Sequence, residues 1–328
     1  MQKYGATAAG KQRWRCTQCN ETSVRKRPDR SLQIQRRLFK NFLISKTTIT
    51  AFAQEHNISR STQFRHFLTH WKTPPPPVVP PHVRVLVIDA TSITTRQCML
   101  FIAADADTSK PVFWSSALRE SGVSWYNFLL HLHKQGVRPA YVVCDGQRGL
   151  LQAIRTVFPD ALVQRCLIHV VRQTCAWLTR YPKTAAGREL LVLAKQLSLI
   201  RTRRHKRKWI KLFHWWCKKH HQFLCEKSVS PTGKKWYTHR RLRGTKSLIK
   251  NAIPDLFRFV TDPTVPRTSN HVEGGINARI QELIRCHRGI TTKQKLTLAS
   301  YYLSARQEQK LMRKPKTKTP KKPTRNDT

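Results

Sequence analysis

The stretch AYVVCDGQRGLLQAI, residues 140–154, constrains the fold more than any other part of the chain. Its apolar run Tyr141–Cys144 predicts a buried strand that ends at Asp145, and Gly146 and Gly149 then lead into a helical pattern. The chain has 17 acidic residues against 62 Lys and Arg. Charged side chains are rarely buried unless they are paired or bind metal, so a scarce acid at this strand end indicates a site.

The composition indicates a polyanionic partner, most simply nucleic acid. The chain has 328 residues, enough for two or three domains, and its net charge is +45. A basic ribosomal-type or membrane-surface protein is the alternative, against which the long apolar runs and the lack of repeats count. Nine scattered cysteines, no signal sequence and no apolar run of ~18 residues predict an intracellular protein with reduced thiols and no membrane partner.

Residues 1–28 resemble the second half of a zinc ribbon. Cys16 and Cys19 form a C-x-x-C after a predicted hairpin strand at residues 10–15. Structural zinc takes four ligands, two from each of two knuckles, and residues 1–15 contain no Cys or His. Three interpretations stay open: a truncated start, a decayed knuckle, or two ordinary thiols. Bound zinc is therefore not predicted for this chain.

Residues 29–73 have the pattern of a helix-turn-helix DNA-binding domain, with a plain helical hairpin as the alternative. Ser59 is predicted to cap the second helix, which in such motifs enters the major groove. The residues predicted to be exposed on this helix for DNA binding are Arg60, Ser61, Gln63 and Arg65, and those predicted to be buried are Phe64, Phe67 and Leu68. A Pro-rich linker at 74–82 follows.

Residues 83–169 predict the first part of an α/β, ribonuclease-H-like core. Strands are expected at 83–90, 98–106 and 111–117, then a helix, the strand before Asp145, a second helix and a short strand. In that fold, acids cluster at the ends of the first and fourth strands.

Residues 170–266 predict an all-helical, basic insertion. Within it, a helical stripe expected to be core comprises Trp209, Leu212, Phe213 and Trp216. Trp236 and Tyr237 lie in a loop-like stretch and are predicted to stack on DNA bases. Residues 267–306 complete the core, and the basic tail 307–328 is predicted to be disordered.

Three acids form the candidate site. Asp89 is predicted to end the first strand, Asp145 the fourth, and Glu273 to lie in the first turn of a late helix. Taken singly, they could begin a turn, cap a helix or form a capping box with Asn270. Taken together, they supply oxygen ligands for two Mg²⁺ ions. The following Gly274-Gly275 costs about 1 kcal/mol per glycine in a helix, which indicates close approach of DNA or another backbone.

Four motifs carry a resemblance to a known family: VLVIDAT around Asp89, VVCDGQRGL around Asp145, QRCLIHVVRQ with Cys166 and His169, and SNHVEGGIN around Glu273. Over residues 83–306 the chain resembles the DDE transposases of the mutator-like group in bacterial insertion sequences, in a subgroup with an N-terminal zinc-ribbon and helix-turn-helix region. It departs from the common pattern in having Arg172-Gln173 instead of Arg-Asn, and in having Gly274-Gly275 where bulkier residues are common.

The resemblance implies an enzyme that binds terminal inverted repeats, cleaves DNA and transfers strands. The three acids would be catalytic and hold two Mg²⁺ ions, for which Mn²⁺ can substitute. The implied partner is double-stranded DNA of the transposon ends and target, bound by a homo-oligomer at the nucleoid of a bacterial cytoplasm. Cys166 and His169 are expected to be structural, or His169 to contact DNA near the cleaved phosphate. A non-catalytic or truncated DNA-binding repressor, and a structure-specific nuclease on the same fold, are the alternatives.

Overall fold

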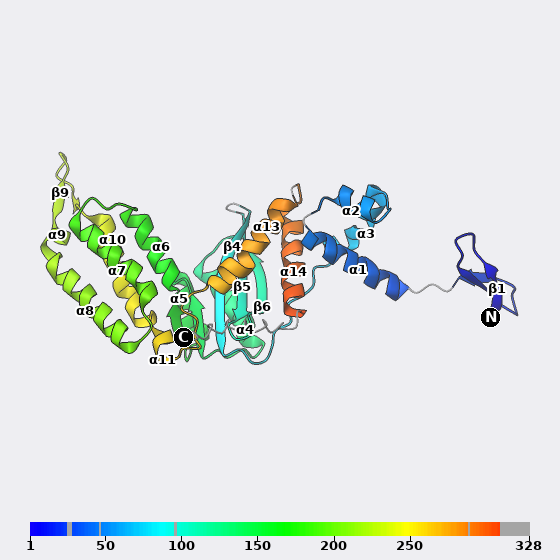
Figure 1. Ribbon diagram of the computed structural model, residues 1–328, viewed down its shortest axis with the longest axis horizontal. Coiled ribbons are helices and arrows are strands. Elements are labelled where there is room, and N and C mark those ends of the chain that lie inside the picture. Colours follow the sequence, from blue (N-terminus) through cyan, green and yellow to red (C-terminus); the bar gives the residue numbers. More distant parts are fainter. Residues whose placement is uncertain (25–27, 46, 95–96, 288, 309–328) are drawn as a thin grey trace, which may run out of the picture. The chain divides into compact units, whose positions relative to one another are not determined.

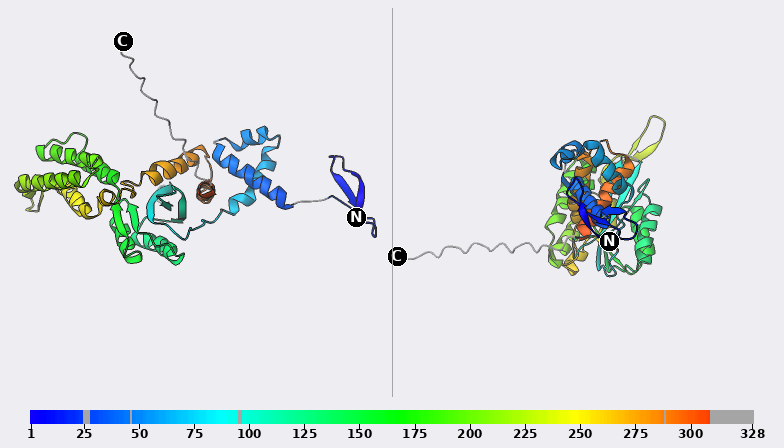
Figure 2. Two further views of the ribbon diagram at one scale, coloured as in Figure 1. Left: turned by 60° about the horizontal axis from the view of Figure 1, so that its bottom comes forward. Right: turned by 90° about the vertical axis from the view of Figure 1, so that its right-hand side faces the viewer.

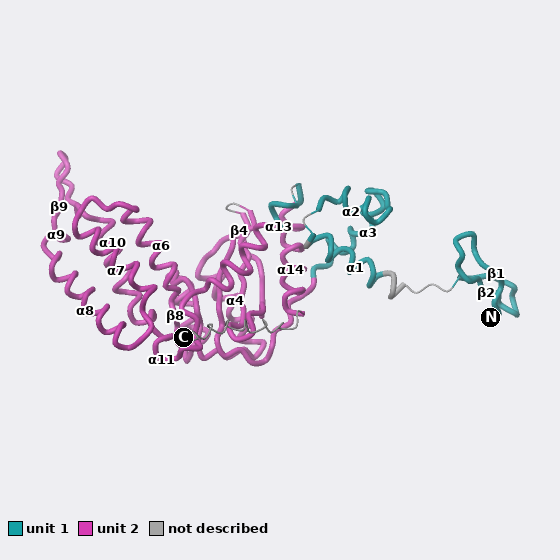
Figure 3. The backbone as a smooth tube through the Cα atoms, viewed as in Figure 1, with its two compact units in different colours: residues 1–74, 283–290 teal, residues 75–282, 291–328 magenta. Residues whose placement is uncertain are grey.

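The computed structural model describes residues 1–24, 28–45, 47–94, 97–287 and 289–308 (Figure 1). The chain divides into two compact units (Figure 3). Unit 1 comprises residues 1–74 and 283–290, and unit 2 comprises residues 75–282 and 291–328. Most of the predicted tail, residues 309–328, lies outside the described residues.

Unit 1 begins with a small antiparallel sheet of three strands, β1 (Gln2–Ala6), β2 (Gln12–Arg15) and β3 (Thr22–Val24). The predicted hairpin strand is thus present as β2. Cys16 and Cys19 lie in the turn after it, where Asn20 has a φ of +57° and donates its N–H to the Cys16 carbonyl at 3.1 Å. Backbone N–H groups of Cys19 and Gln18 lower the pKa of the Cys16 thiol to about 7.

Three helices with a shared aromatic core follow in unit 1: α1 (Pro28–Ser45), α2 (Ile49–Glu55) and α3 (Arg60–Lys72). As predicted, Ser59 caps α3 by accepting the Thr62 N–H at 3.2 Å. Phe39 and Phe42 of α1 pack against Phe67 of α3, with ring centroids 5.0 and 5.2 Å away. The aromatic contacts between helices therefore fix which face of α3 is buried.

That buried face differs from the predicted one. Gln63 is buried rather than exposed, whereas Phe64 and Leu68 are 45% and 37% exposed, so these three predictions were wrong. The buried residues of α3 are Gln63, Phe67, His70 and Trp71. This spacing of i, i+4, i+7 and i+8 is one stripe of a helix, centred where Phe67 and Trp71 pack on Phe39. Arg60, Ser61 and Arg65 are exposed, as predicted.

Unit 2 contains a mixed five-stranded sheet of order β6-β5-β4-β7-β8. Its strands are β4 (Val85–Thr94), β5 (Cys98–Asp105), β6 (Pro111–Ala117), β7 (Tyr141–Cys144) and β8 (Leu162–Arg165). β5 is antiparallel to both of its neighbours, β4 and β6, whereas β7 runs parallel to β4 and β8 runs parallel to β7. The predicted mixed α/β architecture is confirmed.

Strand β4 is longer than predicted, so Asp89 lies inside it rather than at its end. Antiparallel pairing with β5 continues to the Thr94–Cys98 pair. Parallel pairing with β7 stops at the Val87–Val143 pair. Asp89 therefore lies two residues beyond the last partner in β7, and the extent of β4 is set by β5, which the apolar pattern of β4 alone does not reveal.

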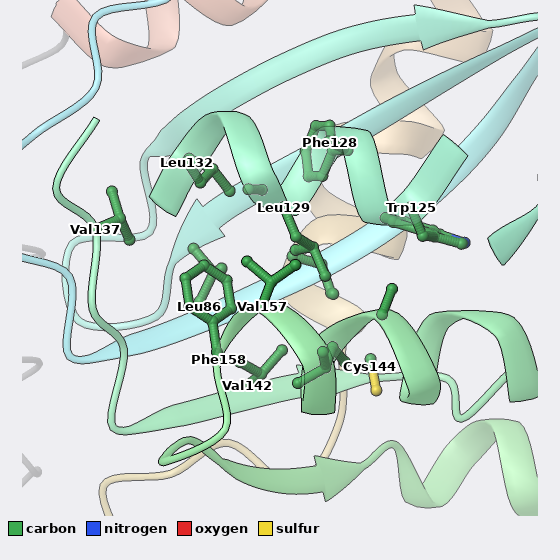
Figure 4. Close-up of a cluster of buried hydrophobic side chains, with 14 of the residues drawn as sticks. Leu86, Trp125, Phe128, Leu129, Leu132, Val137, Val142, Cys144, Val157 and Phe158 are labelled. Atoms are coloured by element: carbon green, nitrogen blue, oxygen red, sulfur yellow. The ribbon is translucent and has the colours of Figure 1, made fainter. Parts of the chain in front are cut away.

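Helices α4 (Gly122–Lys134) and α5 (Arg148–Val157) cover one face of this sheet (Figure 4). Trp125, Phe128, Leu129 and Leu132 of α4 are buried against strand residues such as Val142, as their helical spacing predicts. The two helices touch through glycine backbones. A Cβ atom on Gly149 would lie only 2.9 Å from the Cα atom of Gly122.

Between β8 and the last helices lies a mainly helical region. Its helices are α6 (Leu167–Leu178), α7 (Ala185–Gln196), α8 (Arg203–Lys219), α9 (His221–Cys225), α10 (Arg240–Ala252) and α11 (Arg258–Thr261), with short 3-10 turns at Leu197–Leu199 and Ile253–Asp255. Of the predicted core stripe, Trp209, Phe213 and Trp216 are buried, whereas Leu212 is 37% exposed, so its assignment to the core was wrong.

The region is not all-helical, because a hairpin of β9 (Lys227–Val229) and β10 (Lys235–Tyr237) projects from it (Figures 1 and 2). Its turn is closed by the Ser230 N–H, which donates to the Lys234 carbonyl at 2.9 Å. Gly233 in this turn has a φ of +79°, a conformation that glycine adopts without strain. The polar SPTGKK sequence is thus a hairpin turn within the predicted insertion.

The chain returns to the sheet through α12 (Asn270–Val272), a π-helical segment (Glu273–Asn277), α13 (Ala278–Cys286) and α14 (Thr292–Glu308). α14 packs against β6 and β4, and Trp114 donates its indole N–H to Ser300 Oγ at 3.2 Å. The Gln307 side-chain amide donates to the carbonyl of Val78 at 2.9 Å, which fixes the Pro-rich segment of unit 2. In the described part of the chain, every helix is too short or too polar to cross a membrane.

The glycine contact between α4 and α5 gives the first prediction. Gly149→Ala should lower the free energy of unfolding by about 1–3 kcal/mol, because the new methyl group meets backbone that cannot rotate away. Gly244→Ala in α10 is the matched control, since its Cβ would have its nearest neighbour at 3.5 Å. Urea denaturation of both variants tests this; equal stabilities would contradict it.

Candidate active site

The three predicted acids converge in unit 2 from separate elements. Asp89 lies in β4, Asp145 directly follows β7, and Glu273 opens the π-helical segment. Burial raises the pKa of Asp89 to about 7, opposed by the charge of His169, and the negative charges of Asp145 and Glu273 raise it further. Asp145 and Glu273 therefore both lie close enough to Asp89 to repel its carboxylate.

Asn277 orients Asp89 from the π-helical segment. Its side-chain amide donates to Asp89 Oδ2 at 2.8 Å, and the residue is buried. Gln281, one turn later, donates to Thr91 Oγ1 at 3.0 Å, which attaches α13 to β4. A π-helical turn inserts an extra residue and is frequent at functional sites, and here one such turn carries both Glu273 and Asn277.

Of the two predicted reasons for Gly274-Gly275, close approach of another backbone is not seen among the described residues, and close approach of DNA stays a prediction. A Cβ atom on Gly274 would lie 2.9 Å from Asn270 Oδ1, and one on Gly275 would enter open space. Among the described residues, neither glycine is therefore pressed against another backbone. The alternative of a capping box between Asn270 and Glu273 is also wrong. The N-cap residue of α12 is Ser269 rather than Asn270, and its side chain makes no capping hydrogen bond. The Glu273 carboxylate instead accepts a hydrogen bond from Arg172.

Gly146 makes the turn that positions Asp145, as predicted. Its φ is +88°, and a Cβ atom there would lie 2.0 Å from Nε of the buried Arg165. The Gln147 N–H then donates to Asp145 Oδ1 at 2.9 Å. Gly149, which we also expected in this turn, belongs instead to the helix contact described above.

Glu120 is a fourth acid beside Asp145 that the sequence analysis missed. The buried Trp125 indole N–H donates to Glu120 Oε1 at 3.2 Å and to Gln147 Oε1 at 3.1 Å. Burial raises the pKa of Glu120, and the charge of Asp145 raises it further. The available signal was the scarcity of acids, because Glu120 is one of only 17 acidic residues in the chain. In the structure it lies two residues before the start of α4 at Gly122.

Helix α6 presents cationic side chains to the acids. Arg172 Nη1 donates to Glu273 Oε1, and His169 Nε2 lies 4.0 Å from Glu273 Oε2. Interaction with the Cys166 side chain raises the pKa of His169 to about 9, and the charges of Asp89 and Glu273 contribute. Cys166 itself is buried at the start of α6, where it accepts the Ser269 N–H at 3.4 Å. His169 thus lies at the site as expected, and Arg172 is an addition to it.

The acids suit a hard cation. Glu273 Oε2 is buried without a hydrogen-bond partner, and the buried Asp89 carboxylate carries a raised pKa. The raised pKa means that the charge of the Asp89 carboxylate is incompletely compensated, and carboxylate oxygens are the ligands Mg²⁺ prefers. Within residues 1–24, 28–45, 47–94, 97–287 and 289–308, no three acidic, His or Cys side chains are already gathered as a metal cluster.

The predicted base-stacking residues lie on the β9–β10 hairpin rather than in a loop. Trp236 and Tyr237 are each 38% exposed. The Tyr237 ring is already covered, because the Arg243 guanidinium lies 3.5 Å from its centroid and Lys227 Nζ lies 5.6 Å away. Trp236 is therefore the better stacking residue of the two.

Residues 76–225, less than half of the chain, match the family model described as "Transposase, Mutator family". A probable insertion-sequence transposase of Corynebacterium diphtheriae is 29% identical over 113 residues, covering 33% of each chain. An insertion-sequence transposase of Lactococcus lactis is 30% identical over 133 residues, covering 38% of this chain and 33% of its own length. The matched segments thus span about a third of these relatives. They confirm the resemblance to mutator-type insertion-sequence transposases.

Among solved structures, the Drosophila P element transposase strand transfer complex aligns with 88% of this chain and 81% of its own chain. The sequence identity is 10% and the TM-score is 0.32. A likeness at this score supports no inference about function or site residues.

The buried Asp89 predicts a pH-dependent stability of the metal-free protein. In the folded protein the pKa of Asp89 is about 7, above its ordinary value of 3.8. Between these pH values the unfolded chain ionises at this residue more readily than the folded protein does, so the free energy of unfolding of the wild type falls as the pH rises. Asp89→Asn removes this loss and should be more stable than wild type by at least about 1 kcal/mol above pH 7, with a smaller difference near pH 4. Thermal unfolding with a chelator tests this against exposed Asp160→Asn; a pH-independent difference would contradict it.

Proposed function

We propose that this chain, which resembles the Mutator family of transposases, is the DNA transposase of a bacterial insertion sequence. It would bind the terminal inverted repeats, cleave the DNA and join the freed 3′ end to target DNA. The convergence of Asp89, Asp145 and Glu273 at one end of a mixed sheet carries this proposal. The strand order β6-β5-β4-β7-β8, with only β5 antiparallel to its two neighbours, supports a ribonuclease-H-like core interrupted by the basic, mainly helical region.

Asp89, Asp145 and Glu273 would hold two Mg²⁺ ions, for which Mn²⁺ can substitute. When bound, these ions supply Lewis acidity to the attacking and leaving oxygens of a phosphodiester. The zinc-ribbon assignment of Cys16 and Cys19 forms no part of this proposal.

The side chains around the acids would orient them for this role. Asn277 holds one oxygen of Asp89, and the Gln147 N–H holds one oxygen of Asp145. Arg172 neutralises Glu273 in the free protein. The guanidinium of Arg172 and the neighbouring imidazolium of His169 would also bind the cleaved phosphate of the anionic substrate.

DNA recognition would fall to both units. The exposed residues Arg60, Ser61 and Arg65 at the start of α3 would read the major groove, as the second helix of a helix-turn-helix does. The basic region and Trp236 would bind the DNA backbone and bases. Two transposon ends must be joined, so we propose a homo-oligomer on double-stranded DNA at the bacterial nucleoid.

Cleavage of end DNA tests the proposal. Labelled duplex carrying the inverted repeat that flanks the coding sequence should be cut by wild type with Mg²⁺ or Mn²⁺. Asp89→Asn, Asp145→Asn and Glu273→Gln should each cut more than about 100-fold more slowly while still binding, because loss of even outer-shell metal partners costs 10–100-fold.

Asp160→Asn removes an exposed carboxylate from the same unit and is the matched control, expected to cut at the wild-type rate. Normal cutting by any one of the three site variants would refute its assignment. Wild type that binds but never cuts would favour a DNA-binding repressor instead.

Helix α3 gives a separate prediction. Arg65→Ala should weaken binding to end DNA about tenfold without changing thermal stability, because an Arg contact to a base edge contributes about 1–3 kcal/mol. Gln63→Met, at the buried neighbouring position, should leave DNA affinity unchanged and shift stability by less than about 1.5 kcal/mol. Fluorescence anisotropy with specific and scrambled duplexes measures the DNA affinity of both variants, and thermal unfolding measures their stability. Loss of sequence specificity in Gln63→Met would contradict the buried position of Gln63 and support its predicted exposure to DNA.

A further inference from the structure

A cavity of about 390 Å³ lies in the helical region of unit 2, away from the three acids. It is formed where the end of α6 meets the starts of α7 and α10. The side chains of its lining that matter here are those of Trp177, Lys183, Thr184, Thr238, Arg240 and Arg241. Cations, hydroxyl groups and one aromatic ring therefore face a single concave space.

The cavity has no anion of its own. No acidic residue lines it, and in the part of the chain that the structure describes, Lys183, Arg240 and Arg241 have no carboxylate partner. By contrast, Lys219 of the same helical region is paired with Glu189 at 2.7 Å. The nearby acid Glu226 is already engaged by His239 at 2.9 Å. Three uncompensated cations around one hollow favour a ligand with closely spaced negative charges.

The aromatic ring of the cavity is held in place. Trp177 is 36% exposed, and a Cβ atom on Gly244 of α10 would lie 3.5 Å from its Cζ3 atom. The indole thus lies beside α10 while part of the ring stays accessible. An accessible indole beside cations is the combination that binds a nucleic-acid strand, with stacking on a base and contacts to its phosphates.

Helix α6 sets the spacing between this cavity and the acids. Trp177 follows His169 by two helical turns and a little more, which corresponds to about 12 Å along the axis. Successive phosphates of one DNA strand advance by about 3.4 Å along the duplex, so this distance spans about three to four nucleotides. Arg172, between the two, already points to Glu273.

We propose that this cavity binds the sugar-phosphate backbone of the DNA strand about three to four nucleotides from the phosphodiester to be cut. Lys183, Arg240 and Arg241 bind the phosphates, and Trp177 stacks against the adjoining base. This inference rests on the proposed transposase function. It adds a defined subsite to that function, and the subsite holds the strand in register with the acids.

Neutralising one phosphate at a time tests this subsite. In a series of end duplexes, each carries a single uncharged methylphosphonate at a different distance from the cut. The affinity of wild type for each duplex is measured in Ca²⁺, which supports binding without cleavage. We expect a several-fold loss of affinity confined to positions about three and four. The variant Arg240→Gln/Arg241→Gln should bind unmodified DNA more weakly and show no further loss at those positions. Its affinity should also fall less steeply with salt, by about 0.9 per lost phosphate contact.

Matched controls come from α8. Arg203→Gln/Arg204→Gln removes the same charge from exposed positions outside the cavity and should keep the wild-type methylphosphonate profile. Trp177→Ala should weaken binding to end DNA several-fold, whereas Trp215→Ala, which removes a more exposed indole, should not.

The two levels of the proposal fail differently. If the Arg240→Gln/Arg241→Gln variant retains the wild-type positional profile while wild type cuts DNA and Asp89→Asn does not, the subsite is wrong and the transposase function stands. If wild type neither binds nor cuts end DNA, the proposed function fails and the subsite falls with it.

Discussion

The unequal pairing of β4 is the constraint on which the rest of unit 2 depends. On one side β4 pairs with β5 as far as Thr94, and on the other its partner β7 has already ended near Val143. Beyond that point, one side of β4 lacks a neighbouring strand. The turn with Asp145 and the π-helical segment occupy this position. The point at which the pairing between β4 and β7 ends therefore determines where the acids meet.

Placing acids there has an electrostatic cost, even in a chain of net charge +45. The general positive field does not remove it, because the pKa of Asp89 is still raised to about 7 by burial and by its neighbours. Local partners offset part of the cost: Asn277 donates to Asp89, and Arg172 pairs with Glu273. The site is thus held in a destabilised state that a bound cation would relieve, as expected where stability is exchanged for function.

The sequence predicted those features that depend on local pattern. Apolar runs located all five core strands, and the rarity of acids drew attention to Asp145. Asp89 and Glu273 followed from their places at a predicted strand end and in the first turn of a predicted helix. The sequence failed where contacts between distant elements decide. The rotation of α3 follows from Phe67 packing on Phe39, and the length of β4 follows from β5. Arg172 and Glu273 are 101 residues apart, so no local pattern could pair them.

If unit 2 acts on DNA as proposed, helix α6 would let its distant parts act on one strand. Its first residues are attached to the sheet, because the Cys166 N–H donates to the Cys144 carbonyl at 2.7 Å, immediately before Asp145. His169 and Arg172 then lie beside Glu273, and Trp177 ends the helix at the cationic cavity. A single helix is stiff over this length, since each residue is fixed by the backbone hydrogen bonds around it. A phosphate held at the far end of α6 is therefore held at a fixed distance from the carboxylates at its near end.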